Sequence, residues 1–436
     1  MLITADWIVP VTGEPIRNGA VLLSRGRIAE LGPANELLAR NPDARIHNYP
    51  GCTLMPGLVN AHTHLAMSCL KGLIPSQPFH EWLKHIPVAW NALSDDDIAA
   101  SIAMGALRSI ASGVVAVGDI AYGPESISIA ADTGLGGVFF WEILGIELEG
   151  LPQALYDAEY PSDPLRGCQG RLRCGISPHA SYTSGPRLLQ GTHKIAMAQS
   201  AAFAVHVAES PAEVELLMRG QGPLTRLSDR LAAGFEAPGI TPVRYLDRLG
   251  VLEQALAIHC TRVTPGDIGV LAAKAAGVAL CPRSNAYLEG GSAPIRALAD
   301  SGVALGLGTD SLASNSDLDL FEEARALQAL EPSLSARRII EIMTREGAAT
   351  LGIAGRFGSI EPGRDADFAI FAVSGDDPHA SLLADAGRST IQAVMSAGVW
   401  RVLSSSPVMG VSRVERGSCI AAEKASLALA SSMSDF

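Results

Sequence analysis

The strongest constraint on the fold is an alternation of short apolar runs and longer helical patterns between residues 56 and 355. Apolar runs of strand length recur seven times, each separated from the next by stretches with helical periodicity: 113–119, 137–144, 171–178, 202–209, 255–260, 277–283 and 303–310. Strands that alternate with helices in this way imply a parallel sheet. One more strand, in the segment from Cys52 to Leu65, brings the number to eight, which is the number that closes a (β/α)8 TIM barrel of the α/β class.

The two ends of the chain have a different pattern, with short β-like runs separated by turns. We expect residues 1–55 and 356–410 to pair as one small discontinuous β-sandwich domain beside a barrel of residues 56–355. Residues 411–436 are predicted to form a C-terminal helix and tail, with the helix among the last twenty residues.

Charge and composition exclude several classes of partner. The formal net charge of −12 argues against nucleic acid or an anionic membrane surface as a partner. No apolar stretch reaches the roughly 18 residues of a membrane-spanning helix, and MLITADWIVPVTGEP lacks the pattern of a signal peptide. Seven cysteines without a CxxC motif predict reduced thiols. We therefore expect a cytoplasmic protein with a small-molecule substrate.

The motif His62-Thr63-His64 closes the first barrel strand. Residues two apart on a strand point to one face, so both imidazoles are expected on the same side. Neutral imidazoles suit a borderline metal such as zinc. The motif also lies at the carboxyl end of its strand, where barrel enzymes place their active sites. A structural pair of histidines is the alternative for this motif taken alone.

Other predicted strands end in residues of the same kind. His206 and Glu209 end AFAVHVAES, His259 ends ALAIHC, Asp310 ends VALGLGTD, and His179 follows RLRCGISP. A core histidine satisfied by its neighbours explains any one of these positions, but it poorly explains all of them together.

These residues suffice for a hydrolytic site. Three imidazoles and a carboxylate hold a divalent ion and leave a coordination position for water, whose pKa the ion lowers towards neutrality. Glu209 is placed to take a proton from that water and pass it to the leaving group, while His259 orients the water or polarises the electrophile. The alternative for Glu209 is a carboxylate stabilised at the N-terminus of the helix PAEVELL.

The segments LMPGLVNAHTHL, SPHASYT, HVAES, HC, CPRSN and GTDS, in this order, resemble the amidohydrolase superfamily. The similar branch contains methylthioadenosine/S-adenosylhomocysteine deaminases, triazine hydrolases, guanine deaminase and aminofutalosine deaminases. The resemblance covers nearly the whole chain, because RGRIAELGP and GSIEPGRDADFAIF are similar to the split β domain of that family. The motifs are specific for the superfamily and much less specific for the substrate.

The resemblance assigns the metal ligands of the mononuclear members to His62, His64, His206 and Asp310. It makes Glu209 the proton shuttle and His259 the histidine beside the reacting group, and it gives Asp310 a share in proton transfer. The strand RLRCGISPHA has no Lys that could become a bridging carbamate, which favours one metal ion. The donor set favours zinc, with iron or manganese as alternatives.

The resemblance also assigns His179 and Trp82 to the substrate pocket. Ser284 either lines the same pocket or closes the loop after the seventh strand. Methylthioadenosine/S-adenosylhomocysteine deaminases hold the ribose hydroxyls with an acid soon after the pocket Trp, where this chain offers Trp90 and Asn91. This departure argues against standard methylthioadenosine deamination. In its motifs the chain is more similar to aminofutalosine-deaminase-like sequences.

The predicted activity is hydrolytic deamination of an aminated heterocycle, with a C–N bond of a cyclic amidine as the target and ammonia as a product. An adenine-type nucleoside is the favoured substrate: aminofutalosine, methylthioadenosine, S-adenosylhomocysteine or an adenosine-like compound. The alternative keeps the site and changes the leaving group, as in triazine chlorohydrolases and N-alkylamine hydrolases, or takes a non-nucleoside amine such as guanine or cytosine. The family also implies a homodimer or higher homo-oligomer. Asn315 is predicted to cap the helix of DLDLFEEA.

Overall fold

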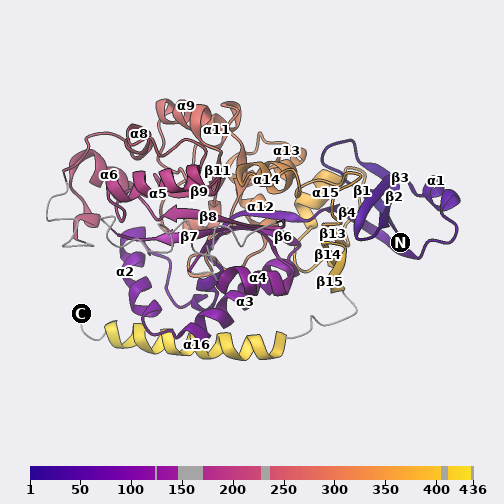
Figure 1. Cartoon of the computed structure of the whole chain (residues 1–436), viewed down its shortest axis with the longest axis horizontal. Coiled ribbons are helices and arrows are strands. Elements are labelled where there is room, and N and C mark those ends of the chain that lie inside the picture. The colour runs from indigo at the N-terminus through magenta and orange to yellow at the C-terminus, as the bar shows by residue number, and fades with distance from the viewer. Residues whose placement is uncertain (123–124, 146–169, 227–235, 404–410, 434–436) are drawn as a thin grey trace.

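The computed structural model describes residues 1–122, 125–145, 170–226, 236–403 and 411–433. Two sheets organise these residues, an eight-stranded parallel sheet and a seven-stranded mixed sheet at one end of the molecule (Figure 1). The fold class predicted from the sequence is confirmed for the barrel, and one mixed sheet forms from the two chain ends.

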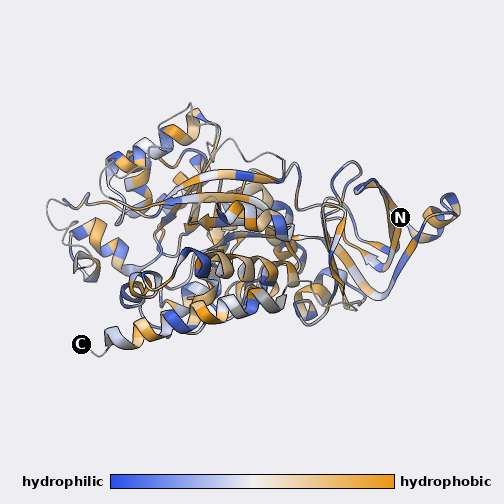
Figure 2. Cartoon of the chain, turned by 60° about the horizontal axis from the view of Figure 1, so that its bottom comes forward, coloured by the Kyte–Doolittle hydropathy of each residue, from blue (hydrophilic) through white to orange (hydrophobic). Residues whose placement is uncertain are grey.

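The eight strands of the barrel follow one another in sequence order around the sheet. They are β5 (Leu58–Thr63), β6 (Val114–Ala121), β7 (Gly136–Ile143), β8 (Leu172–Pro178), β9 (Ala202–Val207), β10 (Ala255–His259), β11 (Gly277–Leu280) and β12 (Leu305–Leu307). β6 is buried along its whole length, as expected for a parallel strand that is covered on both faces. Figure 2 shows the same contrast, with orange strands inside and helices of mixed polarity around them.

Helices and short 3-10 or π turns connect the barrel strands and surround them (Figure 1). They are η1 (Leu65–Leu70), α2 (Phe79–Trp90), α3 (Asp95–Ala111), α4 (Glu125–Thr133), α5 (Pro186–Ala198), α6 (Pro211–Arg219), η4 (Pro223–Arg226), α8 (Pro242–Arg248), α9 (Pro265–Lys274), α10 (Pro282–Tyr287), α11 (Ile295–Asp300), α12 (Leu320–Leu330), α13 (Ala336–Glu341), η5 (Ile342–Glu346) and α14 (Gly347–Thr350). The predicted run 277–283 is a shorter strand than expected, because Pro282 begins α10 instead of continuing β11.

The barrel closes between β5 and the residues that follow β12. Thr63 forms an isolated parallel bridge with Asp310, and the backbone N–H of Asp310 donates to the carbonyl of His62 at 3.1 Å. The seam of the barrel therefore runs through two of the predicted metal ligands.

The mixed sheet has the strand order β15-β14-β13-β4-β1-β2-β3. Its elements are β1 (Leu2–Ile8), β2 (Ile16–Ser24), β3 (Arg27–Pro33), α1 (Ala34–Arg40), β4 (Ile46–Pro56), β13 (Phe368–Phe371), α15 (Pro378–Asp385), β14 (Ile391–Ser396) and β15 (Val399–Leu403). Arg171, at the start of β8, ties this sheet to the barrel through Asp367 at 2.6 Å and the hydroxyl of Ser396 at 2.8 Å. The predicted domain boundaries stay predictions.

The C-terminal helix α16 (Val411–Met433) begins earlier than predicted and packs against α2, α3 and η1. Its buried positions Ala421, Ala425 and Leu429 are spaced by four residues, so they lie along one face of the helix. Lys424 also pairs with Asp97, which forms a capping box with Ser94 at the start of α3. The helix therefore supports α2, one of the elements near the mouth of the barrel.

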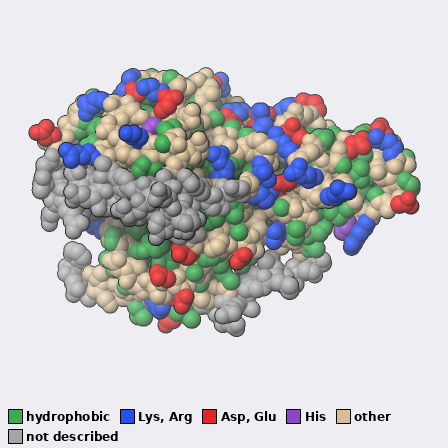
Figure 3. Space-filling view, in the orientation of Figure 1, with side chains coloured by type: hydrophobic (Ala, Val, Ile, Leu, Met, Phe, Trp, Pro, Cys, Tyr) green, Lys and Arg blue, Asp and Glu red, His purple; other side chains and the backbone are tan. Residues whose placement is uncertain are grey.

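Acidic and basic side chains are interspersed on the face in Figure 3, especially over the mixed sheet. None of the helices in the described residues is long and apolar enough to cross a membrane. Among the described residues five cysteines are free thiols, but Cys174 on β8 is disulfide-bonded. The prediction that the cysteines are reduced is therefore wrong for Cys174.

Substitution of two glycines by alanine tests the packing, because one substitution should lower the free energy of unfolding and the other should raise it. Gly137 on β7 has φ 132°, and an added Cβ would lie 2.0 Å from the carbonyl oxygen of Val117 on the next strand. We expect Gly137→Ala to lower the free energy of unfolding by about 3 kcal/mol or more, because rigid backbone must move. Denaturant unfolding monitored by circular dichroism measures this loss.

Gly269 is the matched control, since it lies inside α9 and an added Cβ there meets nothing within 4 Å. Gly269→Ala should raise the free energy of unfolding by roughly 0.5–1 kcal/mol through helix propensity. Equal effects of the two substitutions would contradict the close approach of β6 and β7.

Candidate active site

Three barrel strands end in a backbone conformation that non-glycine residues rarely adopt. The φ angles are 52° at Ala208, 74° at His259 and 55° at Asp310. Such left-handed residues carry strain and cluster at functional sites, where the surrounding structure holds them in place. The strain here accompanies a change in direction of the chain at the carboxyl ends of β9, β10 and β12.

Four imidazoles meet at these strand ends. The ring of His62 lies with its centroid 5.0 Å from His64, 5.0 Å from His206 and 5.5 Å from His259. All four side chains are buried. The structure therefore brings together the predicted ligands His62, His64 and His206 from two strands of the barrel.

Burial keeps the imidazoles of His64, His206 and His259 neutral by lowering the pKa of each. The pKa of His64 falls to about 3, first because of burial and then because of the adjacent His62. Burial likewise lowers the pKa of His206 well below its ordinary value. Metal ligation requires deprotonated imidazoles, so the cluster presents them in the required form near neutral pH.

Asp310 supplies the carboxylate of the cluster. Its Oδ1 lies 3.4 Å from Nε2 of His62 and 3.5 Å from Nε2 of His64. Burial opposes ionisation of Asp310, but the contacts with these histidines hold its pKa well below the ordinary value. Its Oδ2 accepts hydrogen bonds from the hydroxyls of Ser284 at 2.6 Å and Ser314 at 3.1 Å. The serines occupy one oxygen and leave the other facing the histidines.

The donor set fits a divalent ion. Both ring nitrogens of His62 are buried and have no hydrogen-bond partner among the described residues, which is costly for a polar side chain. One ligand atom each from His62, His64 and Asp310 can be chosen within 4.8 Å of one another, and the same holds for His62, His206 and His259. Nδ1 of His206 donates to the carbonyl of His179 at 2.8 Å, so its Nε2 carries the free lone pair. A divalent metal ion would bind one ring nitrogen of His62 together with one ligand atom from each of the other residues.

Glu209 lies beside the cluster and not on the protein surface. Its Oε1 is 3.4 Å from Nε2 of His259, and the side chain of Glu209 is buried. Burial and then the charges of Asp310 and Glu213 raise its pKa well above the ordinary value. Nδ1 of His259 contacts the amide oxygen of Asn285 at 2.9 Å, which fixes the ring. A carboxyl group with a raised pKa is suited to carrying a proton near neutral pH.

Glu213, which the sequence analysis did not select, supports Glu209 from one turn along α6. Its Oε2 accepts the backbone N–H of Glu209 at 2.9 Å, and its Oε1 accepts the hydroxyl of Ser181 at 2.9 Å. Its side chain is fully buried, and burial raises its pKa to about 7. The spacing of four residues in HVAESPAE was the available signal, since it brings the two glutamates to one end of a helix.

His179 and Trp82 lie at different distances from the reacting groups. The ring of His179 is 4.9 Å from that of His206, centroid to centroid, so it borders the cluster. Trp82 on α2 is buried and donates from Nε1 to the carbonyl of Ala313 at 3.1 Å. Substrate contact by these two residues and by Ser284, whose hydroxyl is bonded to Asp310, stays a prediction.

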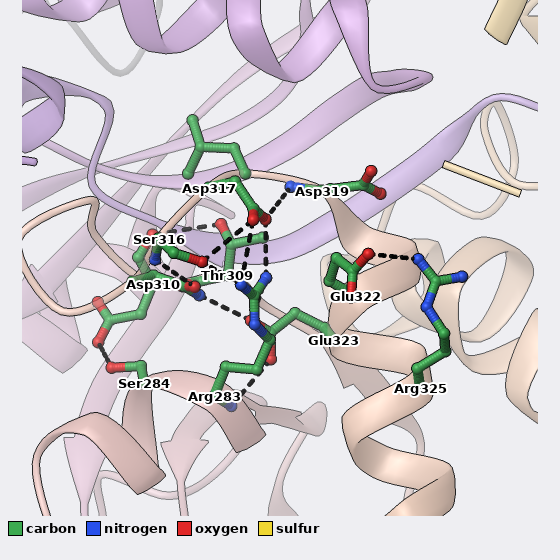
Figure 4. A network of polar contacts seen from close by, with 12 residues as sticks. Arg283, Ser284, Thr309, Asp310, Ser316, Asp317, Asp319, Glu322, Glu323 and Arg325 are labelled. Atoms are coloured by element: carbon green, nitrogen blue, oxygen red, sulfur yellow. Dashed lines mark hydrogen bonds and ion pairs between the residues drawn. The ribbon is translucent and has the colours of Figure 1, made fainter. Parts of the chain in front are cut away.

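A polar network supports the Asp310 loop from the far side (Figure 4). Arg283 pairs with Asp317 at 2.7 Å, and its backbone N–H donates to Glu323 at 3.1 Å. Nδ2 of Asn315 donates to Glu323 at 2.7 Å. The N-cap of α12 is Asp319, so the prediction that Asn315 caps this helix is wrong. A buried acceptor, Glu323, takes the amide of Asn315 instead.

Comparison with known proteins gives the same picture over nearly the whole chain. The Amidohydrolase family model matches residues 53–401, and an Imidazolonepropionase-like composite domain model of bacteria matches residues 19–44. The 5-methylthioadenosine/S-adenosylhomocysteine deaminase of Pelotomaculum thermopropionicum is 31% identical over 90% of this chain and 88% of its own. The aminodeoxyfutalosine deaminase of Deinococcus radiodurans is 32% identical over 80% of this chain and 85% of its own.

Solved structures are also similar. An adenosine deaminase from Xanthomonas campestris, with bound zinc, superimposes with a TM-score of 0.84 at 26% identity. The superposition covers 97% of this chain and 98% of that one.

Removal of the carboxylate tests the metal cluster. We expect Asp310→Asn to lower the affinity for zinc by about 100-fold or more, since a ligand contributes at least as much as a residue that orients one. Zinc per chain, measured by atomic absorption after dialysis against a graded chelator, gives the affinity.

Asp247→Asn is the matched control, because Asp247 on α8 pairs with Lys274 on α9 and is not part of the cluster. It should bind zinc like the wild type. Wild-type affinity in Asp310→Asn would show that the cluster does not use this carboxylate.

We expect Glu213 to affect turnover by positioning Glu209. Glu213→Ala leaves the backbone N–H of Glu209 and the hydroxyl of Ser181 without their acceptor, and we expect turnover to fall by about 10- to 100-fold from unpaired buried groups. Glu213→Gln keeps an acceptor for the N–H and should recover part of this loss. Steady-state kinetics with a substrate that is turned over measures both variants.

The control is Glu215→Ala on the same helix, which should keep wild-type turnover. Zinc content should be unchanged in all three variants. An equal loss in Glu215→Ala would mean that the effect comes from α6 as a whole.

Proposed function

This chain belongs to the amidohydrolase family, and we propose that it is a metal-dependent deaminase of an adenine-type nucleoside that releases ammonia. The observation that carries the proposal is the buried pair of Glu209 and His259, 3.4 Å apart, beside the cluster of His62, His64 and Asp310. This arrangement holds both a metal-binding set and a proton carrier within one buried site.

His62, His64, His206 and Asp310 would hold a divalent ion, which would lower the pKa of a water molecule and so make it a nucleophile near neutral pH. The water oxygen bonds to the ring carbon that carries the amino group, and the C–N bond to that group breaks. Of the two water protons, one ends on the adjacent ring nitrogen and the other on the departing ammonia.

The residues of this chain move those protons. Glu209 takes a proton from the attacking water and delivers it to the ring nitrogen, which its raised pKa allows near neutral pH. His259, oriented by Asn285, faces the same carboxyl and holds the water or the developing oxygen in place. Asp310 stays ionised, so it is an acceptor that shares in the second proton transfer.

The relatives support a nucleoside substrate. Those described above are named as deaminases of methylthioadenosine, S-adenosylhomocysteine and aminodeoxyfutalosine, and a further relative from Methanothermobacter thermautotrophicus, 32% identical, is named a 5′-deoxyadenosine deaminase. Each of these substrates carries an adenine ring. An adenine base is therefore the common group that the site is proposed to recognise.

Three finer features belong to the same proposal. We take zinc as the ion, because three imidazoles and a carboxylate favour it over iron or manganese. We also propose a cytoplasmic location and a homodimer or higher homo-oligomer, neither of which the site geometry addresses.

Ammonia release tests the function. The zinc-loaded protein should release ammonia from at least one of adenosine, 5′-deoxyadenosine, methylthioadenosine, S-adenosylhomocysteine and aminofutalosine. Glu209→Gln should lower turnover by about 100-fold or more, the scale of a lost general acid–base, while zinc content stays unchanged. Ammonia is measured with a coupled glutamate dehydrogenase assay.

Glu346→Gln is the control and should keep wild-type turnover, since Glu346 pairs with Arg338 and accepts the backbone N–H of Leu305 at the start of β12, the opposite end of that strand from Asp310. Silence across the nucleoside panel would refute the nucleoside proposal. Guanine, cytosine and triazines with chloride or alkylamine groups would then test the alternative leaving groups.

A further inference from the structure

Tyr182 lies in the wall of the active site and has no role in the mechanism described above. Its ring is 5.7 Å from that of His179 and 6.1 Å from that of Phe79 on α2, centroid to centroid. It belongs to the same apolar cluster as Trp82. Tyr182 therefore connects the metal-side histidines with the apolar surface near the barrel mouth.

The hydroxyl of Tyr182 has no hydrogen-bond partner among the described residues, although only 2% of the residue is exposed. Buried hydroxyls in folded proteins are almost always bonded to protein or water, because desolvation without a partner costs free energy. Tyr287 shows the usual arrangement in this chain, since its hydroxyl donates to the carbonyl of Ile74 at 2.5 Å. Four buried serine hydroxyls of the described residues also lack a partner, those of Ser109, Ser126, Ser177 and Ser184, but Tyr182 is the tyrosine of this set and its ring contacts His179 beside the cluster.

The loop that carries Tyr182 is held by many hydrogen bonds. Ser181 donates to Glu213 at 2.9 Å, and Nδ1 of His179 contacts the hydroxyl of Thr183 at 2.7 Å. The backbone N–H groups of Thr183 and Ser184 both donate to the carbonyl of Ala180. The loop is therefore fixed on both sides of Tyr182, and the free hydroxyl does not come from a loose segment.

The surroundings make this hydroxyl a donor. Burial, followed by the charges of Glu209 and Glu213, raises the pKa of Tyr182 well above its ordinary value, so the phenol keeps its proton. No hydrogen bond joins it to either glutamate, both of which lie in the described part of the chain. A partner that completes the group must therefore bring an acceptor atom.

We propose that the Tyr182 hydroxyl donates a hydrogen bond to an acceptor atom of the bound nucleoside, either a ring nitrogen or a sugar oxygen, and so helps to set substrate specificity. The inference rests on the proposed function, because that function makes a nucleoside the ligand that would lie against Tyr182. A site that bonds a substrate acceptor rejects analogues without it, because its own polar group is then left unpaired.

The first test is stability, which needs no turnover. Tyr182→Phe removes a hydroxyl that has no partner in the free protein, so its melting temperature should equal or exceed that of the wild type. Tyr287→Phe, the matched control, loses a bonded hydroxyl and should melt lower. Melting is followed by circular dichroism on the zinc-loaded proteins.

The second test is the KM and kcat of Tyr182→Phe with adenosine and a set of analogues. We expect kcat/KM for adenosine to fall roughly 3- to 10-fold, mainly through KM, as for one neutral hydrogen bond. 3-Deazaadenosine and the 2′-, 3′- and 5′-deoxyadenosines each lack one acceptor. The analogue without the acceptor that Tyr182 bonds should be turned over equally by wild type and variant.

The outcomes separate the possibilities. A melting temperature of Tyr182→Phe as low as that of Tyr287→Phe would overturn the proposal, because the hydroxyl would then be bonded in the free protein, to a water for example. An unchanged KM for every nucleoside would overturn it as well. Absence of ammonia from the wild type would instead refute the deaminase function, and calorimetric binding of adenosine to wild type and Tyr182→Phe would still decide the Tyr182 contact.

Discussion

The site depends on the burial of imidazoles and carboxylates that have too few partners of their own. Burial lowers the pKa of His64, His206 and His259 and makes these imidazoles neutral, and contacts with His62 and His64 keep Asp310 ionised. A metal ion would supply the missing partner for one ring nitrogen of His62. The free energy that desolvation costs in the unliganded protein is thus offset by metal binding, which couples the ion to the stability of the barrel.

The backbone around Asp310 also supports the metal-binding cluster. Asp310 both closes the barrel, through its bridge to Thr63, and presents a carboxylate in a left-handed conformation. Ser284 and Ser314 hold one of its oxygens, and the network behind them anchors the loop (Figure 4). Asp310 and His206 are thus each fixed by a further hydrogen bond, an arrangement that raises the metal affinity of a site.

On the other side of the cluster, the start of α6 combines helix formation with catalysis. Ser210 caps the helix and Pro211 occupies its first turn, as favoured at helix N-termini. The same turn carries Glu213, which accepts the backbone N–H of Glu209 and the hydroxyl of Ser181 in the loop after His179. Glu209 and the loop after His179 are therefore held by one buried carboxyl group.

The sequence by itself determined the barrel and the joining of the two chain ends in one sheet, because the alternation of strands and helices is a local pattern. It also determined the cluster of His62, His64, His206 and Asp310, because the positions of these residues at strand ends can be read locally. It did not determine the roles of Glu213 and Tyr182, nor the cap at Asp319 in place of Asn315. Those depend on which buried groups find partners from distant parts of the chain, and only the tertiary structure decides that.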